Sequence, residues 1–187
     1  MLDMSAHSYE LSFEVPTLSE AKEDLIASMF DTVIAVHSGV TTITLTADGD
    51  DCLGAALAAI RTLRETGVEP IRLVDDVVSR SEIARRMGVT PQSVGQWIRG
   101  ERHSESTFPT PYIFTDGGLW LWGEVATALA NRGEEVEEIG YPDRRDIQVI
   151  GGILATDAIA AESGWNSHPD AKTNKSRIVK NKLVQRI

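Results

Sequence analysis

The chain has a single cysteine, Cys52, among its 187 residues. One thiol excludes an intramolecular disulfide framework and leaves no cysteine cluster for zinc, which agrees with a reducing compartment. Cys52 has no histidine or basic residue near it in the sequence, so we do not expect a catalytic thiol. The sequence predicts no metal site and no cofactor.

Long apolar runs are also missing. No stretch approaches the ~20 consecutive apolar residues needed to cross a bilayer, so no membrane partner is expected. The first ten residues have neither the basic region nor the apolar core of a signal peptide. We therefore expect a cytoplasmic protein, and the chain is long enough to bury a core in one or two small domains.

Positive charge is scarce, because 18 Lys and Arg stand against 28 Asp and Glu, for a formal net charge of −10. Such a balance argues against a nucleic-acid partner until the charges are located. Residues 1–78 carry 14 acidic and 4 basic side chains, whereas residues 79–133 carry 6 basic and 5 acidic ones. Phosphate contacts act within a screening length of about 10 Å, so the acidic part need only face away from DNA.

Residues 79–100 have the pattern of two short helices joined by a tight turn. Ser79 and Glu82 have the spacing of a capping box, which predicts a helix from Arg80, and Gly88 would end it. Thr90 would cap a second helix, with Pro91 at its first position. The apolar residues at helical spacing are expected to face inward: Ile83, Met87, Val94, Trp97 and Ile98.

The outward side chains of the second helix would then be Gln92, Ser93, Gly95, Gln96 and Arg99. Gln pairs bidentately with adenine, and Arg with guanine or phosphate. The N-terminus at residues 90–92 offers free N–H groups to a phosphate. We expect base contacts from Gln92, Ser93 and Gln96, and phosphate contacts from Arg80, Thr90, Arg99 and Arg102, with Pro91 in the same surface. An ordinary helical hairpin packed in a core is the alternative.

A hairpin signal follows this segment. The prolines at 109 and 111 predict an extended entry. Residues 112–115 and 119–122 are predicted as strands around Asp116 and Gly117, which would form a wing reaching the adjacent groove. A helix over residues 124–131 would pack back through Val125 and Leu129. Trp120 and Trp122 are simply core residues in the alternative interpretation, which we accept for at least one of them.

Together these parts resemble the winged helix-turn-helix domain of the MerR and AlpA excisionase type, in which an FPxP segment leads into the wing and a Trp precedes the next helix. Ala84, Gly88 and Val94 fit its spacing, and the resemblance covers about 55 residues, 79–133. It implies that the second helix lies in the major groove. Residues 9–133 resemble mostly actinobacterial DNA-binding proteins of undefined role, in which a Gly-rich segment stands where this chain has residues 103–106.

The N-terminal part has the order strand, helix, strand, strand, helix, strand, which predicts an α+β fold with a ferredoxin-like βαββαβ domain. Strict alternation marks residues 9–15 as a strand, and the two β-branched runs on either side of Ser38-Gly39 predict a hairpin. Thr17 and Glu20 are predicted to cap the first helix, whose inward stripe would be Leu18, Ala21, Leu25 and Met29. The second helix would face inward through Leu53, Ala56, Leu57, Ile60 and Leu63.

We therefore predict three parts. Residues 1–76 form the ferredoxin-like regulatory or dimerisation domain, and residues 77–133 the winged helix-turn-helix domain. Residues 134–187 hold a packing or dimer helix over 146–162 and a basic tail, which is either an arm touching phosphates or disordered.

The function predicted is a sequence-specific transcriptional regulator of double-stranded DNA, a repressor acting as a homodimer, because one such module buries too little surface for high specificity. An excisionase-like architectural protein in recombination or partition is the first alternative. The second is a ligand-binding ferredoxin-like protein whose winged module mediates protein contacts. A small-molecule or protein effector on the N-terminal domain is left open. No nucleophile or acid–base pair supports an enzyme.

Overall fold

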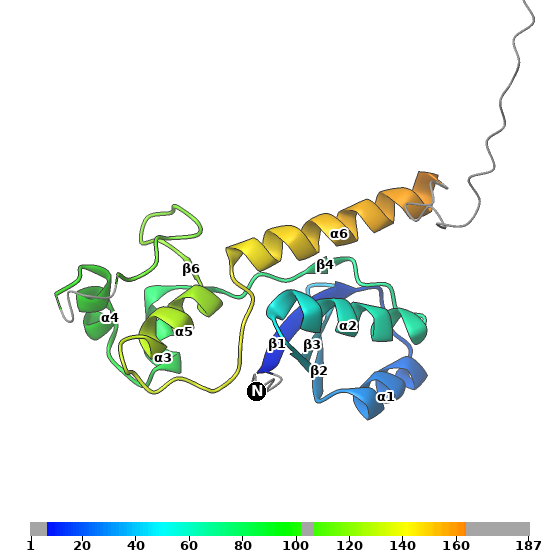
Figure 1. Ribbon diagram of the computed structural model, residues 1–187, viewed down its shortest axis with the longest axis horizontal. Helices are drawn as coiled ribbons and strands as arrows, with labels where there is room; N and C mark the ends of the chain where they lie inside the picture. The colour runs from blue at the N-terminus through cyan, green and yellow to red at the C-terminus, as the bar shows by residue number, and fades with distance from the viewer. Residues whose placement is uncertain (1–6, 102–106, 164–187) are drawn as a thin grey trace, which may run out of the picture.

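The computed structural model describes residues 7–101 and 107–163, and it has an α+β fold with two units side by side (Figure 1). The first unit contains one four-stranded sheet in the order β2-β3-β1-β4, in which all neighbouring strands are antiparallel. Its strands are β1 (His7–Val15), β2 (Thr32–His37), β3 (Val40–Gly49) and β4 (Arg72–Leu73). Ser38 and Gly39 turn the β2–β3 hairpin with positive φ, as the sequence predicts.

Period-two alternation gives this sheet one apolar face. Leu11, Phe13 and Val15 of β1 are buried, and Phe13 lies opposite Ile43 of β3 in the register. Helix α2 (Cys52–Glu65) packs on this face, and the Asp51 carboxylate caps it by accepting a bond from Gly54 N at 2.7 Å. The other face carries polar residues at the alternate positions.

Helix α1 (Glu20–Met29) departs from the sequence prediction. Ser19, not Thr17, occupies the N-cap position, and it makes no side-chain capping bond. The expected stripe is also wrong, because Leu25 and Met29 are 45% and 48% exposed whereas Ile26 is fully buried. Ile26, one position after Leu25, is the residue of this helix that packs into the core.

Helix α6 (Arg144–Ser163) is the helix predicted over residues 146–162. It contacts α2 and β4, and it lies beside them in Figure 1. Its buried residues Ile150 and Leu154 belong to the same apolar cluster as Leu11 and Phe13. The buried apolar side chains of α6 therefore pack against the first unit of the same chain.

The second unit contains β5 (Val77–Val78), α3 (Arg80–Arg86), α4 (Pro91–Ile98), β6 (Trp120–Leu121) and α5 (Trp122–Ala130). It has its own core, in which Ile83, Val94, Trp97, Val125 and Leu129 are buried as predicted. Trp120 and Trp122 both belong to this core.

The predicted two-stranded wing is wrong in its pairing. Residues 112–119 form a loop closed by one isolated bridge between Ile113 and Leu119. Trp120 and Leu121 pair with Val77 and Val78 instead, and Trp122 already begins α5. This pairing buries Trp120 and Leu121 to 2% and 1% exposure, which an exposed hairpin cannot do.

None of the helices in the two described ranges is long and apolar enough to cross a membrane.

Candidate nucleic-acid interface

Helices α3 and α4 begin and end where the sequence predicts. The Ser79 hydroxyl accepts a bond from Glu82 N at 3.2 Å, but the Glu82 carboxylate binds Arg85, so only half of the capping box forms. Gly88 has φ 64° and ends α3 in the left-handed region that suits glycine. Thr90 Oγ1 accepts a bond from Ser93 N at 3.2 Å and caps α4, with Pro91 at its first turn.

The outer face of α4 presents the side chains expected to read bases. Gln92 is exposed and Gln96 half-buried, while Val94 and Trp97 on the inner face are 0% and 4% exposed. Ser93 is half-buried, and its hydroxyl lies 3.0 Å from that of Thr90, so both hydroxyls belong to the cap. Gln92 and Gln96 therefore remain as the adaptable polar groups of this face.

Gly95 corrects the prediction of an exposed outer face, because it is buried. A Cβ built on Gly95 would lie 3.3 Å from Arg99 Nη1 and 4.0 Å from Arg80 Nη1. Two guanidinium groups from the start of α3 and the end of α4 thus converge above a residue without a side chain. Sequence reasoning named both arginines but not their meeting point.

Arg99 is paired within the described part of the chain, and Arg80 forms no ion pair there. Arg99 Nε lies 2.5 Å from Glu101 Oε1, and this contact lowers the pKa of the Glu101 carboxyl. Both side chains are more than half exposed, and such pairs contribute little to stability, so a phosphate can replace Glu101 at low cost. Arg102 and residues 103–106 lie outside the described residues.

Arg86 is held by contacts within the protein. It donates to Asp76 at 2.6 and 2.8 Å, and its guanidinium carbon lies 4.8 Å from the ring centroid of Trp122. Arg85 pairs with Glu82. Among the described arginines of residues 79–101, Arg80 and Arg99 are the two whose guanidinium groups lie beside Gly95 of α4.

The loop over residues 112–119 presents a different surface from the predicted wing. Asp116 and Gly117 are exposed at its turn, as expected. Phe114 is 84% exposed, the largest exposed fraction among the large apolar side chains of the described residues. Sequence reasoning placed Phe114 in a strand and gave it no role, and the consecutive aromatic and apolar residues at 112–114 contain no alternation that would mark Phe114 as outward-facing.

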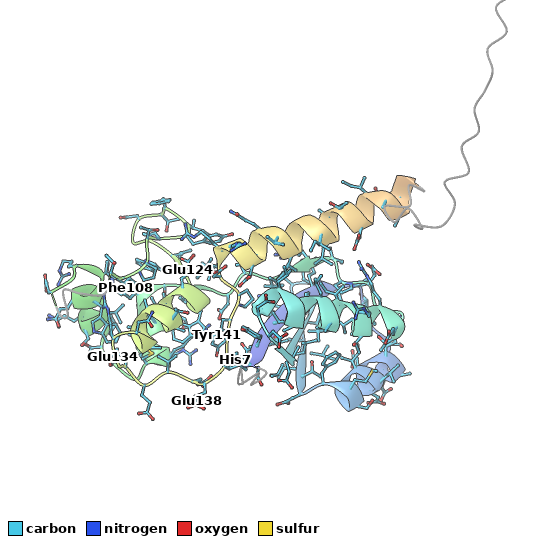
Figure 2. All side chains as sticks on the ribbon, viewed as in Figure 1. His7, Phe108, Glu124, Glu134, Glu138 and Tyr141 are labelled. Atoms are coloured by element: carbon cyan, nitrogen blue, oxygen red, sulfur yellow. The ribbon has the colours of Figure 1, made fainter. Side chains whose placement is uncertain are left out.

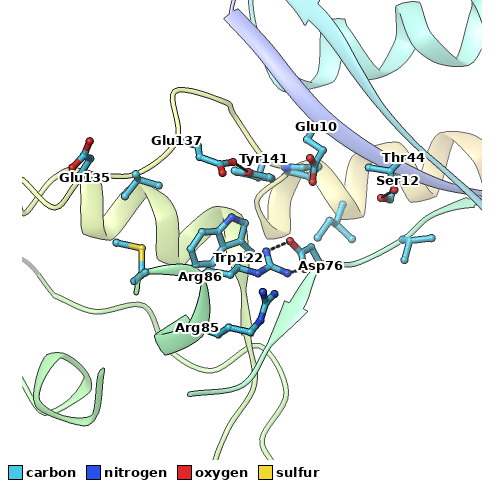
Figure 3. Close-up of a pocket in the computed structure, with 15 residues that line it drawn as sticks. Glu10, Ser12, Thr44, Asp76, Arg85, Arg86, Trp122, Glu135, Glu137 and Tyr141 are labelled. Atoms are coloured by element: carbon cyan, nitrogen blue, oxygen red, sulfur yellow. Dashed lines mark hydrogen bonds and ion pairs between the residues drawn. The ribbon is translucent and has the colours of Figure 1, made fainter. Parts of the chain in front are cut away.

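A cleft of about 590 Å³ lies between the two units, beside the C-terminal end of α3 (Figure 3). It lies between the polar face of the sheet, with Glu10 and Ser12, and the Arg86–Trp122 pair. Burial raises the pKa of Glu10, and the nearby Asp76 carboxylate adds to this effect. Glu135 and Glu137 also line the cleft, so carboxylates outnumber arginines there and a phosphate backbone would be repelled.

The connection between the units is held in place by several contacts. Gly140 N donates to Ser8 O at 2.8 Å, and Glu10 N donates to Gly140 O at 2.9 Å. A Cβ on Gly140 would lie 2.5 Å from the Tyr9 ring, so only glycine fits. Glu124 of α5 pairs with Arg144 of α6 at 2.7 Å, and Figure 2 shows Tyr141 where the two units meet.

Within the described residues, no group of three or more His, Cys, Asp and Glu side chains could hold a metal ion. Comparison of the chain with protein-family models, with curated proteins and with solved structures finds no match in any of the three.

Proposed function

We propose that the protein is a transcriptional regulator that binds double-stranded DNA, a repressor that acts as a homodimer. One observation carries the proposal: Gln92 and Gln96 face outward on a helix whose inner residues are core, beside the guanidinium groups of Arg80 and Arg99. Amides that can pair with adenine and cations that can bind phosphate then lie on one surface.

The arrangement of charge supports this orientation. Helix α4 lies at the end of the molecule away from the four-stranded sheet (Figure 1). The acidic first unit and the cleft with its carboxylates are therefore distant from the surface that would meet phosphates. In the proposed complex Arg80 and Arg99 bind phosphates, and Thr90 orients the first turn of α4, whose N–H groups face the backbone of DNA.

We also propose a fold type for each of the two units, on the basis of the order and pairing of their elements. We assign the first unit to the ferredoxin-like type, because its element order and the strand order β2-β3-β1-β4 agree with the split βαβ arrangement. We assign the second unit to the winged helix-turn-helix type, with the loop over residues 112–119 as a short wing.

An architectural role in recombination or partition is the second candidate, and Phe114 favours it. Proteins that bend DNA insert apolar side chains between base steps, and Phe114 is the most exposed large apolar side chain of the described residues. A regulator should protect one short site, whereas an architectural protein should protect several adjacent ones.

Selection of bound duplexes from a random pool tests the proposal. Purified protein should enrich one short motif, and binding to it should exceed binding to a scrambled duplex. Gln92→Ala should lose about 1–3 kcal/mol on the selected duplex and little on the scrambled one. Arg99→Ala is the matched comparison and should weaken both duplexes alike with a smaller salt slope.

Three results would contradict the proposal or one of its residue assignments. Enrichment of no motif at low salt would remove the DNA-binding function. Equal loss on both duplexes for Gln92→Ala would remove this side chain from base recognition, and a changed sequence preference for Arg99→Ala would make Arg99 a base reader.

A further inference from the structure

The two edges of the four-stranded sheet are protected to different extents. Strand β4 is only two residues long, and α6 packs beside it. Strand β2 is six residues long, and no other described strand pairs with its outer side. It contains no proline, lysine or other charged side chain, which are the usual means of blocking an edge.

The unpaired backbone groups of β2 can be assigned from the hairpin register. Thr46 N donates to Asp31 O, and these two residues stand in the same register as His37 and Val40. In an antiparallel pair the bonded residues alternate, so the odd-numbered residues of β2 bond to β3. The N–H and C=O groups of Thr32, Ile34 and Val36 therefore point outward from the sheet.

Apolar side chains gather around this edge. Five of the ten exposed large apolar residues of the described ranges lie between positions 25 and 40: Leu25, Met29, Val33, Val36 and Val40. Val33 and Val36 are 67% and 68% exposed. No Asp, Glu, Lys or Arg occurs between residues 32 and 47, although residues 1–78 sum to −10. Depletion of charge is typical of an interface core.

We propose that β2 is the dimer interface and pairs antiparallel with β2 of a second copy around a two-fold axis at Ile34. This register puts Ile34 opposite Ile34 of the second copy and Thr32 opposite Val36, so all three outward-pointing residues form bonded pairs. Two four-stranded sheets then become one continuous sheet of eight strands.

Polar side chains at the ends of the edge agree with the same register. Asp31 and His37 are both exposed and flank the apolar positions. Because 31 and 37 add to the same sum as 34 and 34, each Asp31 lies opposite a His37 of the second copy, and this occurs twice in the dimer. An imidazole N–H can donate to a carboxylate, so the edge is complementary to itself in backbone hydrogen bonds, apolar surface and the polar side chains at its ends.

The inference deepens the homodimer part of the proposed function, and its test uses the full chain without DNA. Its failure is therefore distinguishable from failure of DNA binding. Sedimentation over a dilution series should show a dimer for the wild type and a monomer for Val36→Lys, which places an exposed charge on the interface. Ile71→Lys is the matched control, since Ile71 is 50% exposed and directly precedes β4 at the opposite edge of the sheet, and this variant should stay dimeric.

The register has its own test. His37→Asp should weaken dimerisation roughly 2- to 30-fold, because each new carboxylate would face Asp31 of the second copy and two like-charged pairs would replace two imidazole–carboxylate pairs. Adding Asp31→Lys to His37→Asp should restore the affinity. Circular dichroism of each variant checks folding, and amide exchange of Ile34 and Val36 should slow as the wild-type dimer forms.

Either of two findings would overturn the inference. One is a wild-type chain that stays monomeric at the highest soluble concentration. The other is a Val36→Lys variant that dimerises as tightly as the wild type.

Discussion

Two glycines allow close approaches that shape the surface of this protein. Gly95 lets Arg80 and Arg99 converge above α4, and Gly140 lets the connection between the units approach Tyr9. A Cβ at Gly95 would crowd the Arg99 guanidinium at 3.3 Å and would lie in van der Waals contact with that of Arg80. The thiol of Cys52 is buried at the start of α2, beside several carboxylates.

Cys52 gives a prediction about pH. Burial, followed by the negative charge of Asp146, raises the pKa of its thiol from 9.0 to about 12. Above pH 9 the unfolded chain therefore loses this proton while the folded chain keeps it, so the free energy of unfolding falls as the pH rises toward the folded value. We expect a loss of about 2 kcal/mol by pH ~10.5, measured by urea unfolding.

Cys52→Ala is the control for this pH dependence. It removes the thiol but keeps the tyrosines that also titrate in this range, so its stability should fall less steeply than that of the wild type. Parallel profiles for the two proteins would show that the thiol contributes nothing.

At the scale of elements, local patterns predicted the chain better than pairings between distant segments did. Alternation in β1, the Ser38-Gly39 turn and the caps at Ser79 and Thr90 depend on neighbouring residues, and all four are present. The pairing of β6 with β5 joins residues about 40 positions apart and follows from burial of Trp120 and Leu121, which no local pattern contains.

In the candidate site, too, local sequence patterns predicted some features, whereas others depend on contacts between distant segments. Spacing along α4 predicted which side chains face outward, because helical period is a local property. The convergence of Arg80 and Arg99 required the angle between α3 and α4, which depends on core packing. Phe114 is exposed because an irregular loop stands where the sequence predicts a regular hairpin, and no local pattern predicts this loop.

Helix α6 supplies the prediction at this scale. Ile150 is fully buried against the first unit, whereas Ile159 on the same helix is 60% exposed. Ile150→Ala should reduce the free energy of unfolding by about 2–5 kcal/mol, through lost burial and a residual cavity. Ile159→Ala, the same chemical change, should cost less than about 0.5 kcal/mol in urea unfolding. Equal effects would mean that α6 does not stabilise the first unit.

At the scale of the whole molecule, the two units have different proposed roles. The β2 edge of the first unit would join a second copy, and α4 of the second unit would meet DNA. Between them, the Arg144–Glu124 pair and the Gly140 bridge connect the units. A two-fold dimer then presents two α4 helices, which fits a DNA site of two half-sites.

Amide hydrogen exchange of the full chain, with and without the duplex selected from the random pool, directly shows which surface of the protein contacts DNA. We predict slower exchange over residues 79–100 and 112–119 in the complex, and no change in β1 and β3. Protection confined to the cleft residues or to the first unit, with α4 unaffected, would contradict the claim that α4 contacts DNA.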